Sequence, residues 1–200
     1  PGARIGADQV RVEDLASPRS GGTGPGGSGV MSGVEFIAAP AAMVDGHAVS
    51  SSAIRKAVME GRCESAAKML GRNYSITGTV GAGEKRGRDL GFPTANLETD
   101  FAVTVPENGI YATLATVDGA TYRAATGIGV RPTFDTDGGR TIEAFLLDFE
   151  GDLYTKRLRL EFVTRLRSEV AFDSVDELVE QMNRDVEETH EVLAARFPGR

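Results

Sequence analysis

Gly87-Arg88-Asp89-Leu90-Gly91-Phe92-Pro93-Thr94-Ala95-Asn96-Leu97 joins a glycine-rich, cationic segment to a short extended one. Pro93 fixes its own φ angle and disfavours helical geometry at Phe92, so the sequence predicts a strand over 92–97. Residues two apart on a strand share a face, which places Thr94 and Asn96 side by side. A hydroxyl and an amide oxygen at this spacing suit a hard cation such as Mg²⁺, which leaves its remaining positions to water and phosphate oxygens.

The segment before this strand is rich in glycine and in positive charge. We predict a flexible loop whose backbone N–H groups and cations face an anion, most naturally a phosphate. Each signal is weak alone, because glycine-rich loops are more often plain turns and neither a P-loop nor a G-x-G-x-x-G pattern is present. The glycines of this loop are Gly78, Gly81, Gly83, Gly87 and Gly91, and its cations are Lys85, Arg86 and Arg88.

Composition excludes several classes of function. The 200 residues are 40% hydrophobic and 26% charged, which is ordinary for a globular chain of one domain plus a smaller piece. The formal net charge of −7 argues against a general binder of nucleic acid or anionic membrane. The single cysteine, Cys63, excludes an internal disulfide and a cysteine-based metal cluster and fits a cytoplasmic location. The isolated His47 and His190 are expected at the surface, without a ligand role.

Strand-like segments occupy most of the chain after residue 73. Asp118-Gly119 is a hairpin signal between two of them. Because no helical pattern separates the strands, an antiparallel sandwich or barrel is favoured over a parallel sheet. The six predicted strands are 74–80, 92–97, 110–117, 121–128, 141–149 and 157–164.

A long helix is predicted after the last strand. Ser174-Val175-Asp176-Glu177 is a capping box, and it opens a segment with apolar residues at helical spacing. We expect the apolar stripe to cover one face or one mouth of a barrel. Its members are Val175, Leu178, Val179, Met182, Val186 and Leu193.

The first 70 residues have a different character. Residues 17–33 have the composition of a flexible linker, and Val34–Ile37 is a possible strand. The serines of Val49-Ser50-Ser51-Ser52-Ala53-Ile54-Arg55 offer N-caps to a helix that Gly61 ends. A second short helix is predicted over Glu64–Leu70, with Gly71 as its C-cap.

Glu143 is the carboxylate that the pattern singles out, because it interrupts a largely apolar strand. A general base for phosphoryl transfer is one interpretation. The other is an ordinary outward-facing glutamate, since Glu143, Phe145 and Leu147 share one face of an alternating strand. The strand pattern alone does not decide between them.

The whole motif resembles the signature of a known family. Gly78-x-Val80-x-x-Gly83, followed by Lys85-Arg86-Gly87-Arg88-x-Leu90-Gly91-Phe92-Pro93-Thr94-Ala95-Asn96, is similar to riboflavin kinases, in particular the kinase module of the bacterial bifunctional riboflavin kinase/FAD synthetase. The resemblance covers residues 71–193. It implies a mainly β fold, a six-stranded antiparallel Greek-key barrel with a C-terminal α-helix. It also implies Mg²⁺-dependent transfer of the γ-phosphate of ATP to the ribityl 5′-hydroxyl of riboflavin, giving FMN and ADP.

The resemblance also implies roles for individual residues. Glu143 becomes the catalytic base, and Thr94 and Asn96 become the metal ligands. Arg167 lies in Leu166-Arg167-Ser168-Glu169-x-x-Phe172-Asp173-Ser174, which is similar to the segment bordering the flavin, although Ser168 stands where the family usually has Pro. A solvated charge or a helix cap remains the alternative for Arg167. The implied ATP contacts are Gly83, Lys85, Arg86, Arg88, Thr94, Asn96, Leu146 and Leu153, and the implied flavin contacts are Arg167, Val170 and Glu177.

Residues 1–70 resemble the tail of the adenylyltransferase module of the same bifunctional proteins. The similarity rests on Val49-Ser50-Ser51-Ser52-Ala53-Ile54-Arg55, which is like the phosphate motif that closes that module. Domains of 1–70 and 71–200 are therefore expected, with ATP and riboflavin as partners, no nucleic acid or membrane, and possible self-association through the adenylyltransferase module. The chain is expected to make FMN but not FAD. The alternatives are a non-catalytic flavin-nucleotide binding module and an inactive fragment of the bifunctional enzyme.

Overall fold

The computed structural model describes residues 28–31, 34–37, 41–81, 91–99, 102–130 and 139–198. The chain divides into two compact units, 1–43 and 44–200. In the first unit β1 (Ser28–Met31) pairs with β2 (Val34–Ile37) as an antiparallel hairpin. β2 coincides with the predicted strand, whereas β1 lies inside the segment whose composition predicted a linker. The rest of that segment lies outside the described residues.

Two short helices follow the small strands β3 (Met43–Val44) and β4 (His47–Ala48). α2 (Ser51–Met59) begins at Ser50, whose hydroxyl accepts a hydrogen bond from the backbone N–H of Ala53 at 3.1 Å. α3 (Cys63–Leu70) ends at Gly71, which adopts a left-handed φ of 69°. Both predicted helices and their caps are confirmed.

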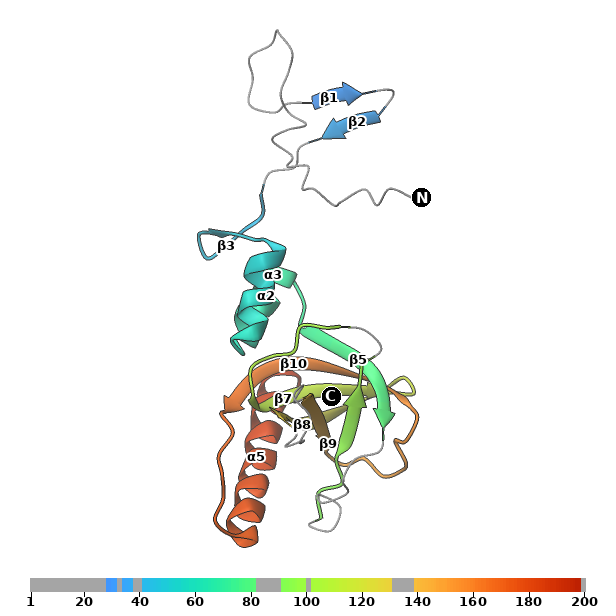
Figure 1. Cartoon of the computed structure of the whole chain (residues 1–200), viewed down its shortest axis with the longest axis vertical. Helices are drawn as coiled ribbons and strands as arrows, with labels where there is room; N and C mark the ends of the chain where they lie inside the picture. The colour runs from blue at the N-terminus through green and yellow to red at the C-terminus, as the bar shows by residue number, and fades with distance from the viewer. Residues whose placement is uncertain are drawn as a thin grey trace, which may run out of the picture. The chain divides into compact units, whose positions relative to one another are not determined.

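Six strands form a closed antiparallel barrel in the order β10-β5-β6-β9-β8-β7 (Figure 1). The prediction of an antiparallel barrel is therefore confirmed. The strands differ from the predicted ranges mainly at their ends, as where β9 stops before Asp148, whose φ is 57°. Their bounds are β5 (Tyr74–Gly81), β6 (Ala95–Glu98), β7 (Gly109–Val117), β8 (Ala120–Val130), β9 (Arg140–Leu146) and β10 (Arg157–Arg167).

Alternate residues of each strand face the barrel interior. On β9, Ile142, Ala144 and Leu146 belong to the interior cluster, so Glu143 and Phe145 face outward. Phe162 belongs to the interior cluster, is fully buried and packs edge-on against Tyr111 with ring centroids 5.5 Å apart.

The predicted C-terminal helix is α5 (Val175–Arg196), and it packs against the outer faces of β7, β8 and β10 (Figure 1). Its C-terminal half is held by an apolar cluster in which Leu193 contacts the barrel. The predicted stripe is wrong in part, because Val175 is 59% exposed. The buried positions of the helix are Asp185, Thr189 and Leu193, so two polar side chains occupy the face that was expected to be apolar.

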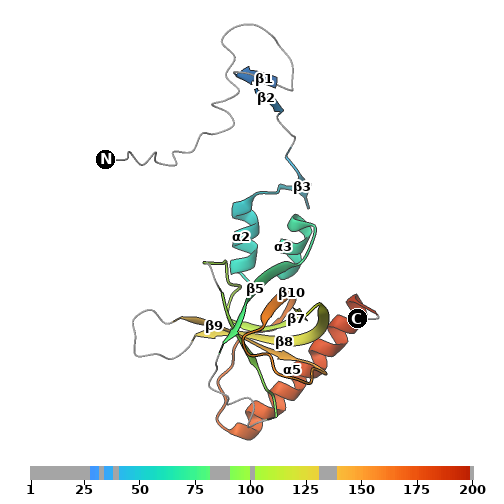
Figure 2. The same ribbon diagram turned by 90° about the vertical axis from the view of Figure 1, so that its right-hand side faces the viewer.

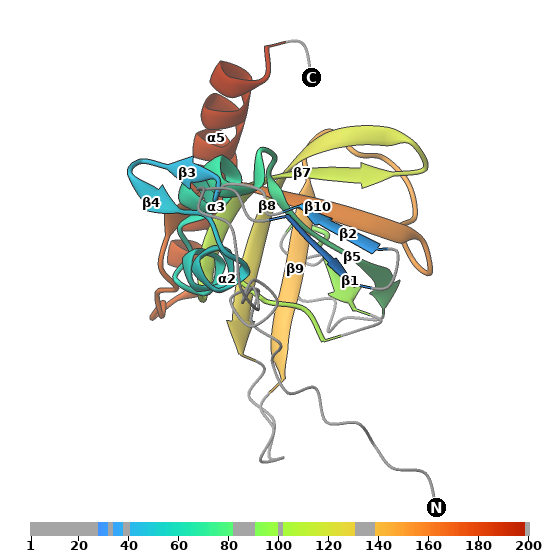
Figure 3. The same ribbon diagram turned by 90° about the horizontal axis from the view of Figure 1, so that it is seen from above.

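α2 and α3 lie side by side, and α3 packs against β5 and β10 (Figures 2 and 3). Cys63 on α3 belongs to the barrel's interior cluster, and burial raises the pKa of its thiol to about 12. Glu64 accepts hydrogen bonds from Thr164 of β10 and from Arg196 of α5. No helix among the described residues is long and apolar enough to cross a membrane.

These contacts predict the result of shortening the chain. Removal of residues 1–43 leaves the contacts of α3 intact, so the melting temperature should stay close to that of the full chain. Removal of 1–70 exposes the surface that Cys63 covers and unpairs Thr164. Burial of a side chain of this kind contributes about 2 kcal/mol, so the melting temperature should fall by roughly 5–10 °C. Differential scanning calorimetry of both shortened chains tests this, and equal melting temperatures would show that α3 is dispensable.

Two glycines assigned to the flexible loop are strand residues instead. Gly78 and Gly81 lie on β5, where β6 passes close to the backbone. A Cβ atom at Gly78 would lie 2.1 Å from the backbone oxygen of Glu98, whereas one at Gly81 would lie 2.0 Å from the Oε1 atom of the Glu98 side chain. Close approach of the strand backbone therefore explains Gly78, whereas Gly81 faces only the side chain of Glu98. Gly83 and Gly87 lie outside the described residues, and Gly91 has a φ of 88° in a turn.

The two glycines should respond differently to the same substitution. Gly78→Ala forces a backbone shift and should cost about 1–3 kcal/mol of unfolding free energy. Gly81→Ala meets only the movable end of a side chain, and the lower entropy of its unfolded chain offsets part of the cost. Urea unfolding of both variants measures the difference. A Gly78→Ala variant as stable as Gly81→Ala would contradict the close-approach explanation.

Candidate active site

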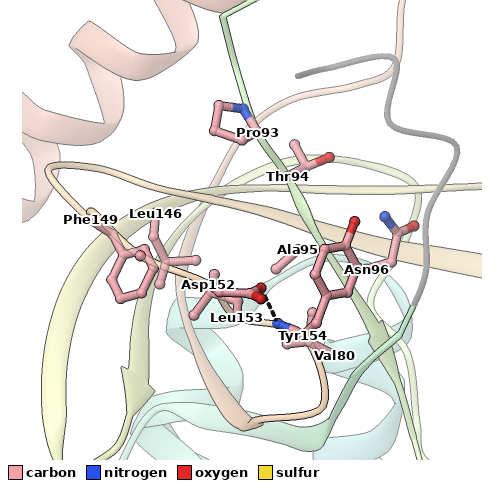
Figure 4. Close-up of a pocket in the computed structure, with 11 residues that line it drawn as sticks. Val80, Pro93, Thr94, Ala95, Asn96, Leu146, Phe149, Asp152, Leu153 and Tyr154 are labelled. Atoms are coloured by element: carbon pink, nitrogen blue, oxygen red, sulfur yellow. Dashed lines mark hydrogen bonds between the residues drawn. The ribbon is translucent and has the colours of Figure 1, made fainter. Parts of the chain in front are cut away.

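Two cavities meet at Thr94, which contributes to the lining of both. The first lies at one end of the barrel, beside the interior residues Val80, Ala95 and Leu146. Figure 4 shows its lining, to which the side chains of Asn96 and Tyr154 contribute. The remaining residues of this lining are Pro93, Phe149, Gly151, Asp152 and Leu153.

A rigid turn forms one wall of the first cavity. The backbone N–H of Tyr154 donates to the Asp152 carboxylate at 2.9 Å (Figure 4). The N–H of Thr155 donates to the carbonyl of Val80 at 2.9 Å, and Val80 donates to the carbonyl of Lys156 at 3.0 Å. These bonds attach the turn to β5 and fix Leu153 and Tyr154 at the cavity.

The second cavity lies on the outer face of the barrel beneath α5. Its floor consists of outward-facing strand residues, and its two walls are the segment after β10 and the N-terminal half of α5. Most of the lining is apolar or aromatic, which suits a flat organic ring system. The lining residues are Phe92, Thr94, Ile110, Ala125, Gly127, Glu143, Phe145, Arg167, Glu169, Val170, Phe172, Leu178, Met182, Asp185 and Val186.

Thr94, Asn96 and Glu143 come together where the two cavities meet. Asn96 is the direct cross-strand neighbour of Glu143 in the pairing of β6 with β9. The hydroxyl of Thr94 donates to Oε2 of Glu143 at 3.3 Å. A hydroxyl, an amide and a carboxylate therefore occupy one small region, although 49 residues separate Thr94 from Glu143.

The orientation of Glu143 bears on the two interpretations that the strand pattern left open. Its side chain does point outward from the barrel, as simple alternation requires. That outward face is covered by α5 and the segment after β10, so the carboxylate faces the second cavity instead of open solvent. Phe145 on the same face packs edge-on against Phe92, with ring centroids 5.4 Å apart.

Arg167 is neither a solvated charge nor a helix cap. Its Nε and Nη2 atoms donate to the two carboxylate oxygens of Asp185 at 2.7 and 2.6 Å, and Nη1 donates to the carbonyl of Ser168 at 2.9 Å. The guanidinium borders the second cavity while it joins β10 to α5. The hydroxyl of Ser168 accepts a hydrogen bond from Arg165 at 3.3 Å.

The other predicted contact residues divide into three groups. Leu146 and Leu153 line the first cavity, and Val170 lines the second. Glu177 lines neither, because its carboxylate accepts the backbone N–H of Asp173 at 3.3 Å and belongs to the cap of α5. The predicted phosphate contacts Gly83, Lys85, Arg86 and Arg88 lie outside the described residues.

Several cavity residues were not predicted from the sequence. Met182 and Val186 were assigned to the barrel-facing stripe, but they line the second cavity. Asp185 was not among the predicted site residues. A carboxylate on the buried face of a helix needs a partner, so its position could have indicated an ion pair. Phe149 and Tyr154 complete the first cavity, whose lining also includes the predicted ATP contact Leu153.

A known protein family and several curated relatives match most of this chain. The family model described as riboflavin kinase (Flavokinase) matches residues 70–193. The chain belongs to the riboflavin kinase family. Among curated relatives, the bifunctional riboflavin kinase/FMN adenylyltransferase of Listeria monocytogenes is 36% identical over 146 residues, which are 73% of this chain and 46% of that protein. The protein of the same name from Bacillus subtilis is 41% identical over 142 residues, covering 70% of this chain and 45% of the relative.

One solved structure extends the comparison. A crystal structure titled as a macrolide-efflux protein from Streptococcus pneumoniae aligns with a TM-score of 0.72 and 34% identity, covering 77% of this chain and 50% of that chain. The Streptococcus pneumoniae chain and the two curated relatives are each about twice as long as the region that matches this chain. This chain thus spans about half the length of the curated relatives that it matches.

Proposed function

We propose that this chain transfers the γ-phosphate of ATP to the terminal ribityl hydroxyl of riboflavin, giving FMN and ADP. Membership of the riboflavin kinase family supports this reaction. The observation that carries the proposal is the position of Thr94, Asn96 and Glu143 at the junction of two cavities of different character. A kinase must bring two substrates together end to end, and a polar junction between two binding sites provides that geometry.

ATP occupies the first cavity in this proposal. Leu146 and Leu153 form its apolar contacts, and the turn at Asp152 and Tyr154 closes it. Gly83, Lys85, Arg86 and Arg88 lie outside the described residues, and we propose them as the phosphate contacts because of their glycine-rich, cationic sequence.

Riboflavin occupies the second cavity in this proposal. Its ring system lies among the aromatic and apolar side chains, with Arg167 and Val170 at the border. The ribityl chain then points toward Glu143 and Thr94, where the cavities meet.

The donor set at the junction fits Mg²⁺. The Thr94 hydroxyl donates a hydrogen bond to Glu143, so the lone pairs of the Thr94 oxygen stay available for a cation, and Asn96 adds an amide oxygen. No group of three or more His, Cys, Asp or Glu side chains among the described residues is placed to hold a metal ion. Thr94 and Asn96 would therefore share the ion with phosphate oxygens and water, as Mg²⁺ prefers. When bound, the ion neutralises charge that develops on the phosphates.

Glu143 is the proposed general base. Its carboxylate faces the second cavity and lies within reach of the Thr94 hydroxyl at the junction. It would accept the proton of the ribityl hydroxyl as that oxygen attacks the γ-phosphorus. The hydrogen bond from Thr94 holds the carboxylate in place, so that one pair of residues orients both the metal side and the base side of the reaction.

Turnover assays test the proposal directly. Incubation with riboflavin, ATP and Mg²⁺, followed by chromatography, should yield FMN. FAD should not form, because the only segment resembling an adenylyltransferase phosphate motif is Ser50-Ser51-Ser52-Ala53-Ile54-Arg55.

Glu143→Gln should lower kcat by roughly 10²- to 10⁴-fold, the usual contribution of a general base, while riboflavin still binds. Flavin binding without any turnover by the unaltered chain would favour a non-catalytic carrier.

A second prediction concerns the metal ligand. Thr94→Val removes the hydroxyl but keeps the shape, and kcat/KM for MgATP should fall by at least about tenfold, since even outer-sphere partners of a metal contribute 10- to 100-fold. Thr94→Ser retains the oxygen and should keep most of the activity. The matched control is Thr116→Val, which removes an exposed threonine hydroxyl that pairs with Thr121 on the barrel surface. Wild-type turnover of Thr94→Val at limiting Mg²⁺ would remove Thr94 from the metal site.

A further inference from the structure

The two walls of the second cavity are connected by one buried ion pair. Asp185 on α5 has a side chain only 7% exposed, and it binds Arg167 at the end of β10 through two parallel hydrogen bonds. Gln181, one turn earlier on α5, donates a third hydrogen bond to Asp185 at 2.9 Å. The Arg167 guanidinium also holds the carbonyl of Ser168, the first residue of the opposite wall.

The two halves of α5 are anchored in different ways. The C-terminal half packs through Leu193 into an apolar cluster with the barrel, and Arg196 bonds Val163 and Glu64. In the N-terminal half, Leu178 and Met182 line the second cavity. Among the described residues, Asp185 makes the only side-chain hydrogen bonds between this half of the helix and a strand.

We propose that Asp185 is a positioning residue that sets the width of the flavin cavity by fixing the N-terminal half of α5 to the end of β10. This inference rests on the proposed function of the cavity. A bidentate arginine–carboxylate pair fixes both distance and orientation, which an apolar contact between flexible side chains does not. Without the pair, Leu178 and Met182 have no fixed distance from the wall formed by Arg167, Val170 and Phe172, so the contacts on the two faces of the ring system no longer form together.

The test compares two sets of polar contacts that hold α5 against the rest of the chain. Asp185→Asn keeps the shape but loses the charge and one acceptor of the pair with Arg167. Arg196→Gln disrupts the contacts of Arg196 at the far end of the helix, away from the cavity lining. Asp185→Asn should raise the KM for riboflavin on the order of tenfold, with the KM for ATP and kcat nearly unchanged. Arg196→Gln should lower thermal stability without raising the riboflavin KM. An equal rise in both variants, or none in Asp185→Asn, overturns the proposal.

A second variant covers the case in which Asp185→Asn does not fold. Asp185→Glu keeps the charge and the pair but adds one methylene, which pushes α5 away from β10, so it too should weaken riboflavin binding in a folded protein. Riboflavin fluorescence titration measures this binding without any turnover. Absence of FMN formation by the unaltered chain would refute the kinase activity. Unchanged riboflavin affinity in the Asp185→Glu variant would refute the role of Asp185.

Discussion

The pairing of β6 with β9 is the constraint on which the barrel and the site both depend. It consists of the cross-strand pairs Ala95 with Ala144 and Asn96 with Glu143. The first pair has small, buried side chains, so the two strands approach closely inside the barrel. The second pair places an amide beside a carboxylate on the other face. A slip of one residue would exchange the two faces, and it would place Glu143 in the apolar interior, so barrel closure and site assembly are the same event.

Strand alternation around this pairing explains why two different cavities share one junction. Inward-facing residues of β6 and β9 contribute to the cavity at the barrel end, and outward-facing residues of β9 form the floor of the cavity under α5. Thr94 precedes β6 and borders both cavities. A barrel whose outer face was open to water would leave Glu143 solvated. The helix that covers the outer face therefore creates the second site as well as burying apolar surface.

The sequence predicted those features that depend on nearby residues. Local features were predicted correctly, namely the caps of α2, α3 and α5, the hairpin at Asp118-Gly119 and the alternation of β9. Features that depend on distant partners were not predicted. Gly78 is required by the approach of Glu98 on the next strand, and the burial of Asp185 depends on Arg167, which belongs to a different element. Glu143 lay between these cases, because strand alternation predicted its direction, but the sequence did not show which face of the barrel the predicted helix covers.

The polar positions on α5 are explained by its two roles: it covers the outer face of the barrel, and it forms one wall of the second cavity. A helix that only covered a barrel would have an apolar stripe along its whole length, and replacing a buried ion pair by well-packed apolar residues is often neutral or stabilising. The Arg167–Asp185 pair is thus poorly explained by stability alone. Apolar packing is used where the helix lies directly on the barrel, around Leu193. Where the helix stands off from the strands over the second cavity, apolar contact would close the gap. A charged pair of fixed length keeps it open, because its two ends bind only at one separation and in one orientation.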